Sequence, residues 1–266
     1  MPAAPVTLVE ADRRCVWVPG TWGELVQGVR PNGQRVLVSL PSKRGAWVHG
    51  RVVLRRAGEP PVCVPPGHSK AARAVVLLMQ RLDVRDAQLL LGFHSCLSRG
   101  VGHASSSADV LGALRLAGRL LGRSLSSATL CELASTVEAT NPVLVPGACL
   151  FEPDAGQVLG QAPMPPLRGI PLQWGAGRET KGRGQASWSP SARRRFERIL
   201  CTLLEGLEHC DPVRVIQAST ASALLLAERE QRTDVVACLE RARALGAAGI
   251  SASHSGTGVV ALFPGR

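Results

Sequence analysis

Apolar and polar positions alternate in short segments along the first part of the chain, and turn-forming residues separate these segments. Such a pattern predicts β-strands. The expected strands are residues 14–18, 35–40, 46–54 and 87–93. Pro31-Asn32-Gly33 predicts a turn between the first two strands. One helix is expected over residues 69–82, where apolar side chains recur with the spacing of a helix face.

Helical periodicity dominates the rest of the chain. Two helices are expected over residues 106–121 and 126–138, and serines at both starts predict capping of the free backbone N–H groups. Residues 152–190 are rich in proline and glycine, and we interpret them as a connection between lobes, with strands at 148–151 and 169–174. The later elements are expected to be helices at 196–207, 212–228 and 233–246, and a strand at 258–263. Strands first and helices last predict an α+β protein in two lobes.

Composition narrows the class of protein. Apolar residues make up 45% of the 266 residues, which is enough for a sizeable core. Aromatic residues make up only 3% and tyrosine is absent, which argues against stacking on single-stranded nucleic acid. The net charge of +11 fits either an ordinary basic surface or attraction to anions such as nucleotide phosphates. No nucleic-acid motif accompanies this charge, so we expect no nucleic acid partner.

The cysteines and the N-terminal residues bear on the cellular compartment. The eight cysteines form no C-x-x-C pair, which argues against a zinc site or a disulfide framework. Residues 1–14 lack the basic and apolar regions of a signal peptide, and no apolar segment approaches the roughly 20 residues that span a bilayer. We therefore expect reduced thiols, a cytoplasmic location and no membrane association.

Residues 98–109, here called the glycine loop, lie between a predicted strand and a predicted helix. The sequence is Ser98-Arg99-Gly100-Val101-Gly102-His103-Ala104-Ser105-Ser106-Ser107-Ala108-Asp109. Glycines let the backbone approach a phosphate closely, and a helix start offers free N–H groups and the positive end of the helix dipole. The segment is neither a Walker loop nor a G-x-G-x-x-G fingerprint. Taken alone, it fits an anion cradle and a flexible turn with a serine cap about equally well.

Three further segments accompany the glycine loop: residues 19–28, PGTWGELVQG; residues 138–151, which begin Glu-Ala-Thr-Asn; and residues 253–258, SHSGTG. Taken in order, the four segments resemble the motifs of the GHMP kinase superfamily. They are most similar to the L-threonine kinases of cobalamin biosynthesis and propanediol utilisation. The joint resemblance covers residues 19–263 and is more specific than any single motif. It implies a ribosomal S5-like N-terminal lobe, residues 1–160, and a ferredoxin-like C-terminal lobe, residues 161–266.

The resemblance also implies roles for individual residues. ATP phosphates would bind to the glycine loop at Gly100, Val101, Gly102, His103, Ala104, Ser105, Ser106 and Ser107. Magnesium would bind Ser107 together with Glu138, which is expected to end a helix; a carboxylate and a hydroxyl suit this hard cation. The substrate would lie against Gly20, Thr21, Glu24, His254, Ser255 and Gly256. Taken singly, Glu138 can also be an ordinary acid at a helix end, Glu24 a surface acid in a turn, and His254 a structural residue.

The chain departs from the family pattern at two places. Asn141 stands where the threonine kinases carry an aspartate, and asparagine cannot accept a proton. An aspartate of nearly equal size would be expected to fit there without repacking. The chain also stops soon after residue 263, where GHMP kinases continue for a helix and a strand, so the C-terminal sheet is expected to lack an edge strand or to have it covered by a partner.

The leading hypothesis is therefore an ATP- and magnesium-dependent kinase of a small amino acid-like substrate, with L-threonine as the default and L-serine next. The partner is expected to be this small molecule, and a homodimer is compatible with the sequence. A catalytically weak relative that binds nucleotide as a binding or regulatory protein is the main alternative, favoured by Asn141 and the short C-terminal end. The hypothesis of a basic nucleic-acid-binding protein rests on the net charge alone.

Overall fold

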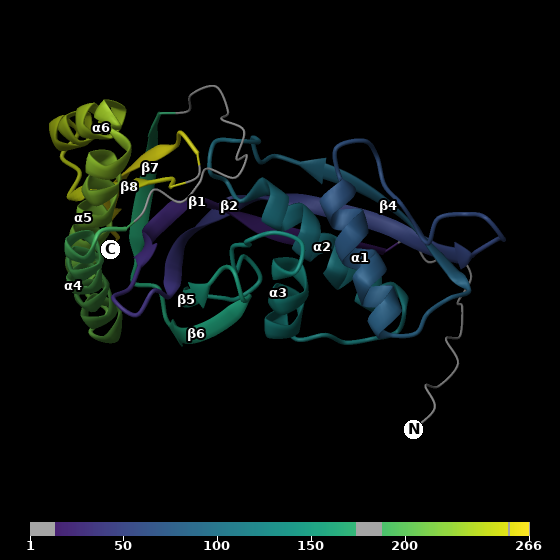
Figure 1. Cartoon of the computed structure of the whole chain (residues 1–266). Helices are drawn as coiled ribbons and strands as arrows, with labels where there is room; N and C mark the ends of the chain where they lie inside the picture. Colours follow the sequence, from purple (N-terminus) through teal and green to yellow (C-terminus); the bar gives the residue numbers. More distant parts are fainter. Residues whose placement is uncertain (1–13, 174–187, 255, 266) are drawn as a thin grey trace.

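The computed structural model describes residues 14–173, 188–254 and 256–265. It has an α+β fold in which a nine-stranded sheet runs through the whole molecule (Figure 1). The strand order is β3-β4-β2-β1-β8-β9-β7, and β5 and β6 extend from β2. The bounds of these strands are β1 Arg14–Val29, β2 Arg35–Leu54, β3 Val62–Cys63, β4 Ala87–Ser95, β5 Ala148–Glu152, β6 Gln157–Ala162, β7 Leu167–Gln173, β8 Gly249–Ala252 and β9 Val259–Pro264.

The strands β1 and β2 form one long antiparallel hairpin at the centre of the sheet. The predicted turn joins them: the N–H of Gly33 donates to the carbonyl of Arg30 at 2.9 Å, and Gly33 has a φ of +88° that suits glycine. The pairing shifts register between Pro19 and Val26, within the segment that resembles the first family motif. Such irregularities re-aim side chains and are common beside active sites.

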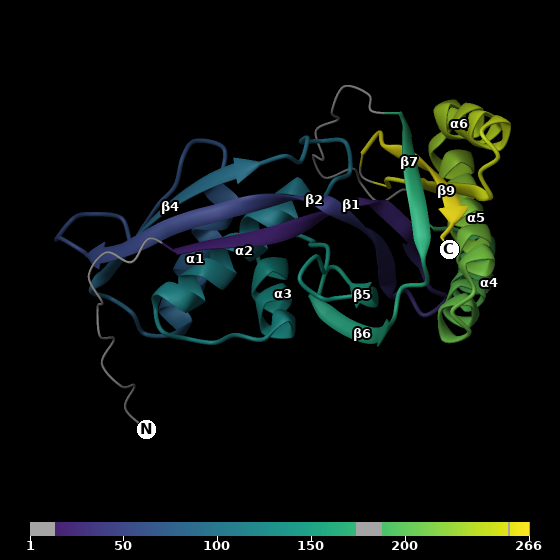
Figure 2. The ribbon, with the colours of Figure 1, turned by 180° about the vertical axis from the view of Figure 1, so that it is seen from behind.

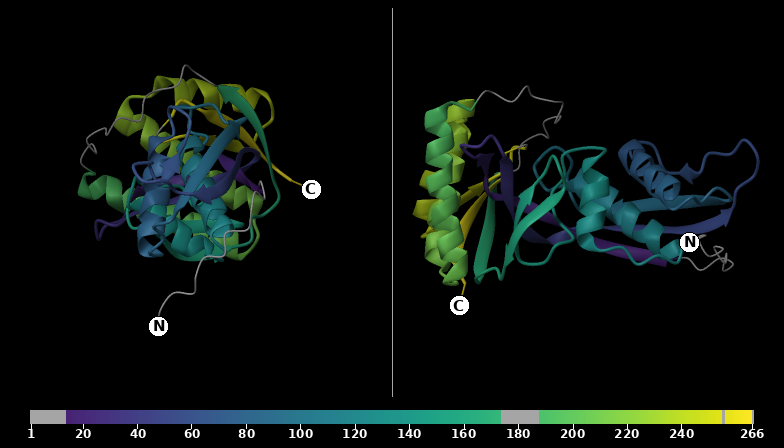
Figure 3. Two further views of the ribbon diagram at one scale, coloured as in Figure 1. Left: turned by 90° about the vertical axis from the view of Figure 1, so that its right-hand side faces the viewer. Right: turned by 60° about the horizontal axis from the view of Figure 1, so that its bottom comes forward.

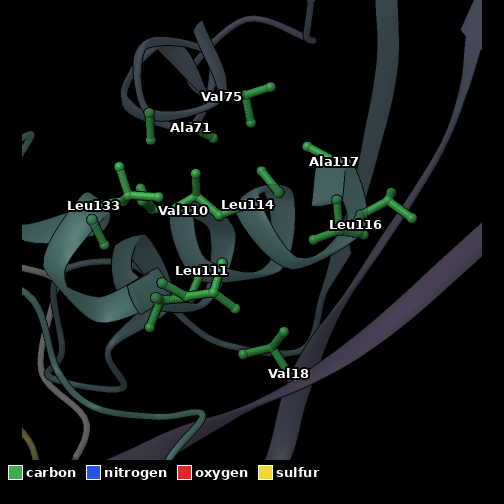
Figure 4. Packing of buried hydrophobic residues seen from close by; sticks show 14 of the residues in the cluster. Val18, Ala71, Val75, Val110, Leu111, Leu114, Leu116, Ala117 and Leu133 are labelled. Carbon is green, nitrogen blue, oxygen red and sulfur yellow. The ribbon is translucent and has the colours of Figure 1, made fainter. Parts of the chain in front are cut away.

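Three helices cover one face of the first part of the sheet: α1 Ser69–Arg81, α2 Ser105–Leu120 and α3 Ser127–Ser135. The helix α2 is buried along most of its length and forms the centre of this core. Figure 4 shows Val110 and Leu114 of α2 facing Ala71 and Val75 of α1, while Leu111 lies on the side of Val18 of β1. This core consists almost entirely of aliphatic side chains, as the low aromatic content requires.

Three further helices, α4 Pro190–Glu208, α5 Pro212–Glu230 and α6 Thr233–Ala244, gather at the other end of the sheet (Figures 2 and 3). They bury a second group of apolar residues around Phe196 against β1 and β9, and a third around Val235 against β8 and β9. Among the described residues, no helix is both long and apolar enough to cross a membrane. All eight cysteines are unpaired, as expected.

The predicted α+β fold is confirmed, and every predicted helix and strand has a counterpart, except that the two strands expected at 35–40 and 46–54 form the single strand β2. The sequence missed β3, β6 and β8, which are short, and it missed the continuation of β1 through residues 19–29. The segment taken as an irregular connection contains β6 and β7, and part of it, with residue 174 of the predicted strand, lies outside the described residues. The helix expected over 126–138 ends at Ser135, so Glu138 lies in the turn beyond it.

Candidate active site

The end of the glycine loop leaves the start of α2 open. Three of its residues have positive φ angles: Gly100 (+74°), Gly102 (+94°) and Ala104 (+53°). Ala104 is the N-cap of α2, and no side chain caps this helix. The expectation of a serine cap is therefore wrong for α2, because an alanine occupies the capping position. The uncapped N–H groups and the positive end of the helix dipole can serve an anion instead.

Residues 19–28 hold the glycine loop from one side. The N–H of Thr21 donates to the carbonyl of His103 at 3.0 Å, and its hydroxyl donates to the carbonyl of Gly102 at 3.2 Å. Gly20 lies so close that a Cβ there would be 2.7 Å from the carbonyl oxygen of His103. Thr21 and His103 are both buried. The loop backbone is therefore fixed against β1 by main-chain contacts that only small residues permit.

Residues 253–258, here called the third motif, hold the glycine loop from the other side. The N–H of Gly258 donates to the carbonyl of Val101 at 3.0 Å. A Cβ on Gly102 would lie 1.7 Å from the hydroxyl oxygen of Ser253, and one on Gly256 would lie 2.2 Å from the carbonyl carbon of Val101. Ser255 lies outside the described residues. Segments more than 150 residues apart in the sequence are therefore packed backbone to backbone here.

Sequence reasoning missed the group that holds the third motif in place. The buried guanidinium of Arg232 donates to the carbonyls of Ser253 (2.8 Å) and Gly256 (3.2 Å) and pairs with Asp234 at 2.7 Å. The pattern around Arg232 gave no signal, because a single arginine before a helix is usually a surface residue. Its role depends on contacts with a segment some twenty residues away.

Glu138 meets the start of α2 from the turn after α3. One carboxylate oxygen accepts a hydrogen bond from the hydroxyl of Ser106, and the other pairs with Lys70 of α1. The predicted magnesium partner of Glu138 was Ser107, whose buried hydroxyl instead accepts a hydrogen bond from the N–H of Asn141 at 3.1 Å. Lys70 was not predicted, because a lysine at a helix start carries no motif.

A second pair of missed residues lies beside Asp109, at the end of the glycine loop. His68 Nε2 is 3.6 Å and Arg99 Nη2 is 3.5 Å from Oδ2 of Asp109. Burial raises the pKa of Asp109, while His68 and Arg99 act to lower it. His68 also stacks on Phe93, with ring centroids 4.1 Å apart. This side of the loop is therefore basic, although it contains one buried acid.

Glu24 and Asn141 are direct neighbours. The amide nitrogen of Asn141 is 3.3 Å from Oε1 of Glu24, and the backbone N–H of His254 donates to Oε2 at 3.0 Å. Glu24 is 2% exposed, and burial raises the pKa of its carboxyl group despite these two hydrogen bonds. Its carbonyl accepts from the hydroxyl of Ser251 at 2.9 Å, which ties β1 to β8. Three of the predicted site residues thus form one hydrogen-bonded cluster.

His254 is a neutral histidine. Burial, with the charges of Arg232, Arg229 and Arg35, lowers its pKa to about 3. Its Nε2 lies 3.5 Å from the hydroxyl of Ser222 on α5. Because the ring carries no charge near neutral pH, it cannot act there as a cationic ligand for phosphate.

A cavity of about 250 Å³ lies between β1, β2 and the segment that follows Asn141. Gly20, Thr21, Ser39, Pro142 and Cys149 are among the residues that line it. The hydroxyl of Ser39 is buried and has no hydrogen-bond partner. Ser39 stands opposite Glu24 in the β1–β2 register. The cavity is therefore a small, mainly apolar space.

The residues present suit magnesium only with further oxygen ligands. Among the described residues, no group of three or more histidine, cysteine or acidic side chains could hold a metal ion. One carboxylate, Glu138, does lie beside the hydroxyl of Ser106 at the open helix start. Magnesium commonly binds one or two protein oxygens and takes its remaining ligands from water and phosphate. The site fits magnesium as a companion of a phosphate ligand.

Comparison with protein families supports the sequence resemblance. Residues 69–148, which run from α1 through the glycine loop to β5, match the model of the GHMP kinases N terminal domain. No curated protein matches the chain. The family match concerns residues 69–148, and the L-threonine kinase branch is not separately supported.

Solved structures share the fold over nearly the whole chain. A homoserine kinase from Cytophaga hutchinsonii is 16% identical with a TM-score of 0.69, and the alignment covers 97% of this chain and 87% of that one. A phosphomevalonate kinase from Streptococcus pneumoniae is 14% identical with a TM-score of 0.69, covering 94% and 91%. A mevalonate kinase from L. major, solved with R-mevalonate, is 16% identical with a TM-score of 0.67, covering 98% and 90%. This chain has the fold of GHMP kinases.

Proposed function

We propose that this protein is an ATP- and magnesium-dependent kinase that phosphorylates the hydroxyl group of a small amino acid-like substrate, with L-threonine as the first candidate. The observation that carries the proposal is the uncapped start of α2, which lies in one contact network with Glu138, Asn141 and Glu24. The lobe of residues 1–160 supplies these groups, and the lobe of residues 161–266 supplies His254 and Gly256.

In this proposal the glycine loop binds the phosphates of ATP. The free N–H groups of Ser105, Ser106 and Ser107 face the phosphate oxygens, and Lys70 adds a positive charge at the same helix start. Glu138, with the hydroxyl of Ser106 or Ser107, holds magnesium, which neutralises charge on the phosphates when it is bound. Phosphoryl transfer depends mainly on such positioning and charge neutralisation.

The acceptor substrate is proposed to lie between the cavity and the third motif. A space of about 250 Å³ is small for a drug-sized ligand and suits an amino acid. The arginines around His254 make the adjoining side positive, which suits the carboxylate of an amino acid. Homoserine, the substrate named for one structural neighbour, is likewise an amino acid with a free hydroxyl.

One observation favours a second candidate, a protein that binds nucleotide with little turnover. Asn141 stands at the place where the resembled threonine kinases have aspartate, and it cannot take a proton from the substrate hydroxyl. General-base assistance contributes typically about 10²–10⁴-fold where it operates. A kinase without it relies on positioning alone.

The two candidates separate in one experiment. ATP consumption is measured with magnesium against a panel of amino acids and amino alcohols, and binding of a non-hydrolysable ATP analogue is measured by calorimetry. Turnover that depends on L-threonine or a related hydroxy amino acid supports the kinase. ATP binding without turnover on any panel member favours the binding protein. Absence of ATP binding contradicts both.

A further inference from the structure

We propose that Glu24 is a positioning residue that orients the side-chain amide of Asn141, so that the amide oxygen Oδ1 faces the substrate hydroxyl. The inference rests on the proposed kinase function, and it assigns the acceptor role in the reaction to an uncharged oxygen. The carboxyl group that the threonine kinases resembled by this sequence carry at position 141 is here found one contact away, on Glu24.

The hydrogen-bond chemistry of the pair determines which way the amide points. An ionised carboxylate has only acceptor oxygens, whereas the asparagine amide has a donor end and an acceptor end. Oε2 of Glu24 is already occupied by the N–H of His254, and Oε1 lies 3.3 Å from the amide nitrogen of Asn141. The amide NH₂ group therefore faces Glu24, and Oδ1 lies on the side away from it.

The backbone of Asn141 is fixed as well, so that the side chain has little freedom to adjust. Its N–H donates to the hydroxyl of Ser107 in the first turn of α2 at 3.1 Å, and its carbonyl accepts from the N–H of Val143 at 2.8 Å. These contacts place Asn141 directly beside the predicted phosphate site. A reversal of the amide would bring its oxygen against the carboxylate of Glu24, which is repulsive.

The oxygen Oδ1 is available to a ligand. It accepts no hydrogen bond from the described residues, and it is not among their buried polar atoms without a partner. The residue itself is half-buried at the edge of the site. A hydroxyl that donates its hydrogen to Oδ1 directs an oxygen lone pair elsewhere, and the neighbouring helix start is where the phosphate chain is proposed to lie.

The transfer itself balances without a protein base. The substrate oxygen forms a bond to the γ-phosphorus, and the bond from that phosphorus to the bridging oxygen breaks, leaving its electron pair on ADP. The hydroxyl proton, held by Oδ1 during the approach, passes to an oxygen of the transferred phosphoryl group. Asn141 contributes orientation, and Glu24 contributes the orientation of Asn141.

The same contact changes the expectation for an aspartate at position 141. An aspartate is nearly equal in size to asparagine, but Asn141→Asp places a second carboxyl group about 3.3 Å from that of Glu24. Two carboxylates at this distance do not both ionise readily, and one of them acquires a strongly raised pKa. The single substitution is therefore expected to disturb the site rather than restore it.

Three variants test the pairing: Glu24→Gln, Asn141→Asp and the double variant. In Glu24→Gln, the glutamine can keep the bond from His254 and present its NH₂ to position 141, so Asn141 must turn its oxygen inward. We expect kcat to fall about 10–100-fold with little change in the affinity for ATP analogue. In the double variant, the glutamine NH₂ donates a hydrogen bond to the new carboxylate at position 141. The other oxygen of that carboxylate again faces the substrate. We therefore expect the kcat of the double variant to be well above that of either single variant.

Thermal unfolding provides a readout that does not depend on activity. In Asn141→Asp, the melting temperature relative to the parent falls as the pH rises from 5 to 8, because two carboxylates then compete for one proton. The double variant loses this extra pH dependence. Glu132→Gln on the exposed face of α3 is the control for removal of one charge.

The outcomes separate the two proposals. Rescue in the double variant, in kcat and in the pH dependence of melting, supports the pairing. The pairing is overturned if the fold-losses in kcat of the two single variants simply multiply in the double variant. It is also overturned if kcat is unchanged in Glu24→Gln. If no form consumes ATP with any substrate, the kinase proposal fails, while the melting data still decide whether positions 24 and 141 are coupled. An Asn141→Asp variant with the pH dependence of the parent would overturn the pairing in that case also.

Discussion

The starts of α2 and α3 differ although both are rich in serine. In α3, Ser126 has extended backbone angles and its hydroxyl accepts a hydrogen bond from the N–H of Thr129 at 3.1 Å. In α2, the N-cap is Ala104 in the left-handed region, with no side-chain cap. The helices α4 and α5 are capped by Ser189 and Asp211. The helices α1 and α6 also start without a side-chain cap, so the open start alone does not distinguish α2. What distinguishes α2 is that its open start lies at the end of the glycine loop and beside Glu138, where a ligand can bind the free N–H groups.

The largest expected effect comes from Gly102, whose conformation gives the α2 start its shape. A left-handed φ costs a residue with a Cβ roughly 1–2 kcal/mol, and the Cβ would also collide with Ser253. We expect Gly102→Ala to reduce affinity for an ATP analogue by about tenfold or more, as measured by calorimetry, and to lower the melting temperature.

Gly58 provides a matched control for Gly102. Its φ is +84°, and a Cβ there would meet nothing within 4 Å. Gly58→Ala should therefore show the cost of the backbone conformation alone. Equal losses of stability in the two variants, with unchanged nucleotide affinity in both, would show that the loop does not depend on its contact with Ser253.

A smaller effect is expected at Glu138, which contacts the α2 start through Ser106. Glu138→Gln keeps the shape but removes the charge that the proposed magnesium needs. The magnesium concentration for half-maximal ATP turnover, or for half-maximal analogue binding, should rise much more than the metal-free affinity changes. Glu132→Gln on α3 should show neither effect. The same magnesium dependence in Glu138→Gln and the parent would remove Glu138 from the metal site.

The serines of the two helix starts should separate stability from binding. Ser126→Ala removes the cap of α3 and should reduce the free energy of unfolding by about 1 kcal/mol without changing nucleotide affinity. Ser106→Ala removes no cap, so the unfolding free energy should change little while analogue binding with magnesium weakens. Denaturant unfolding and calorimetry on both variants check this. A reversed pattern would mean that the α2 start has a structural role only.

The smallest effect at neutral pH is expected at His254, whose contribution to stability changes only as the pH falls. Its pKa is about 3 in the folded protein and near 6.5 when unfolded, so the unfolded chain binds the extra proton as the pH falls below 6.5. The contribution of this residue to stability is therefore present at neutral pH and is lost progressively between pH 6.5 and 3. His254→Gln should make the fall of stability with pH shallower in that window. An unchanged slope would show that the ring is protonated in the folded protein as readily as in the unfolded chain.

By itself, the sequence determined the helices and most strands, because their periodicity is local. It also determined the four motifs, and the structure brings described residues of all four into contact around the glycine loop. It could not find Arg232, Lys70 or β8, since their roles come from contacts with distant segments. The sequence also could not show which group faces the side chain of Asn141. Glu24 is 117 residues away in the chain, but its Oε1 lies 3.3 Å from the amide nitrogen of Asn141. Spacing along a chain predicts which residue types recur together, but burial and the direction of hydrogen bonds are decided by packing.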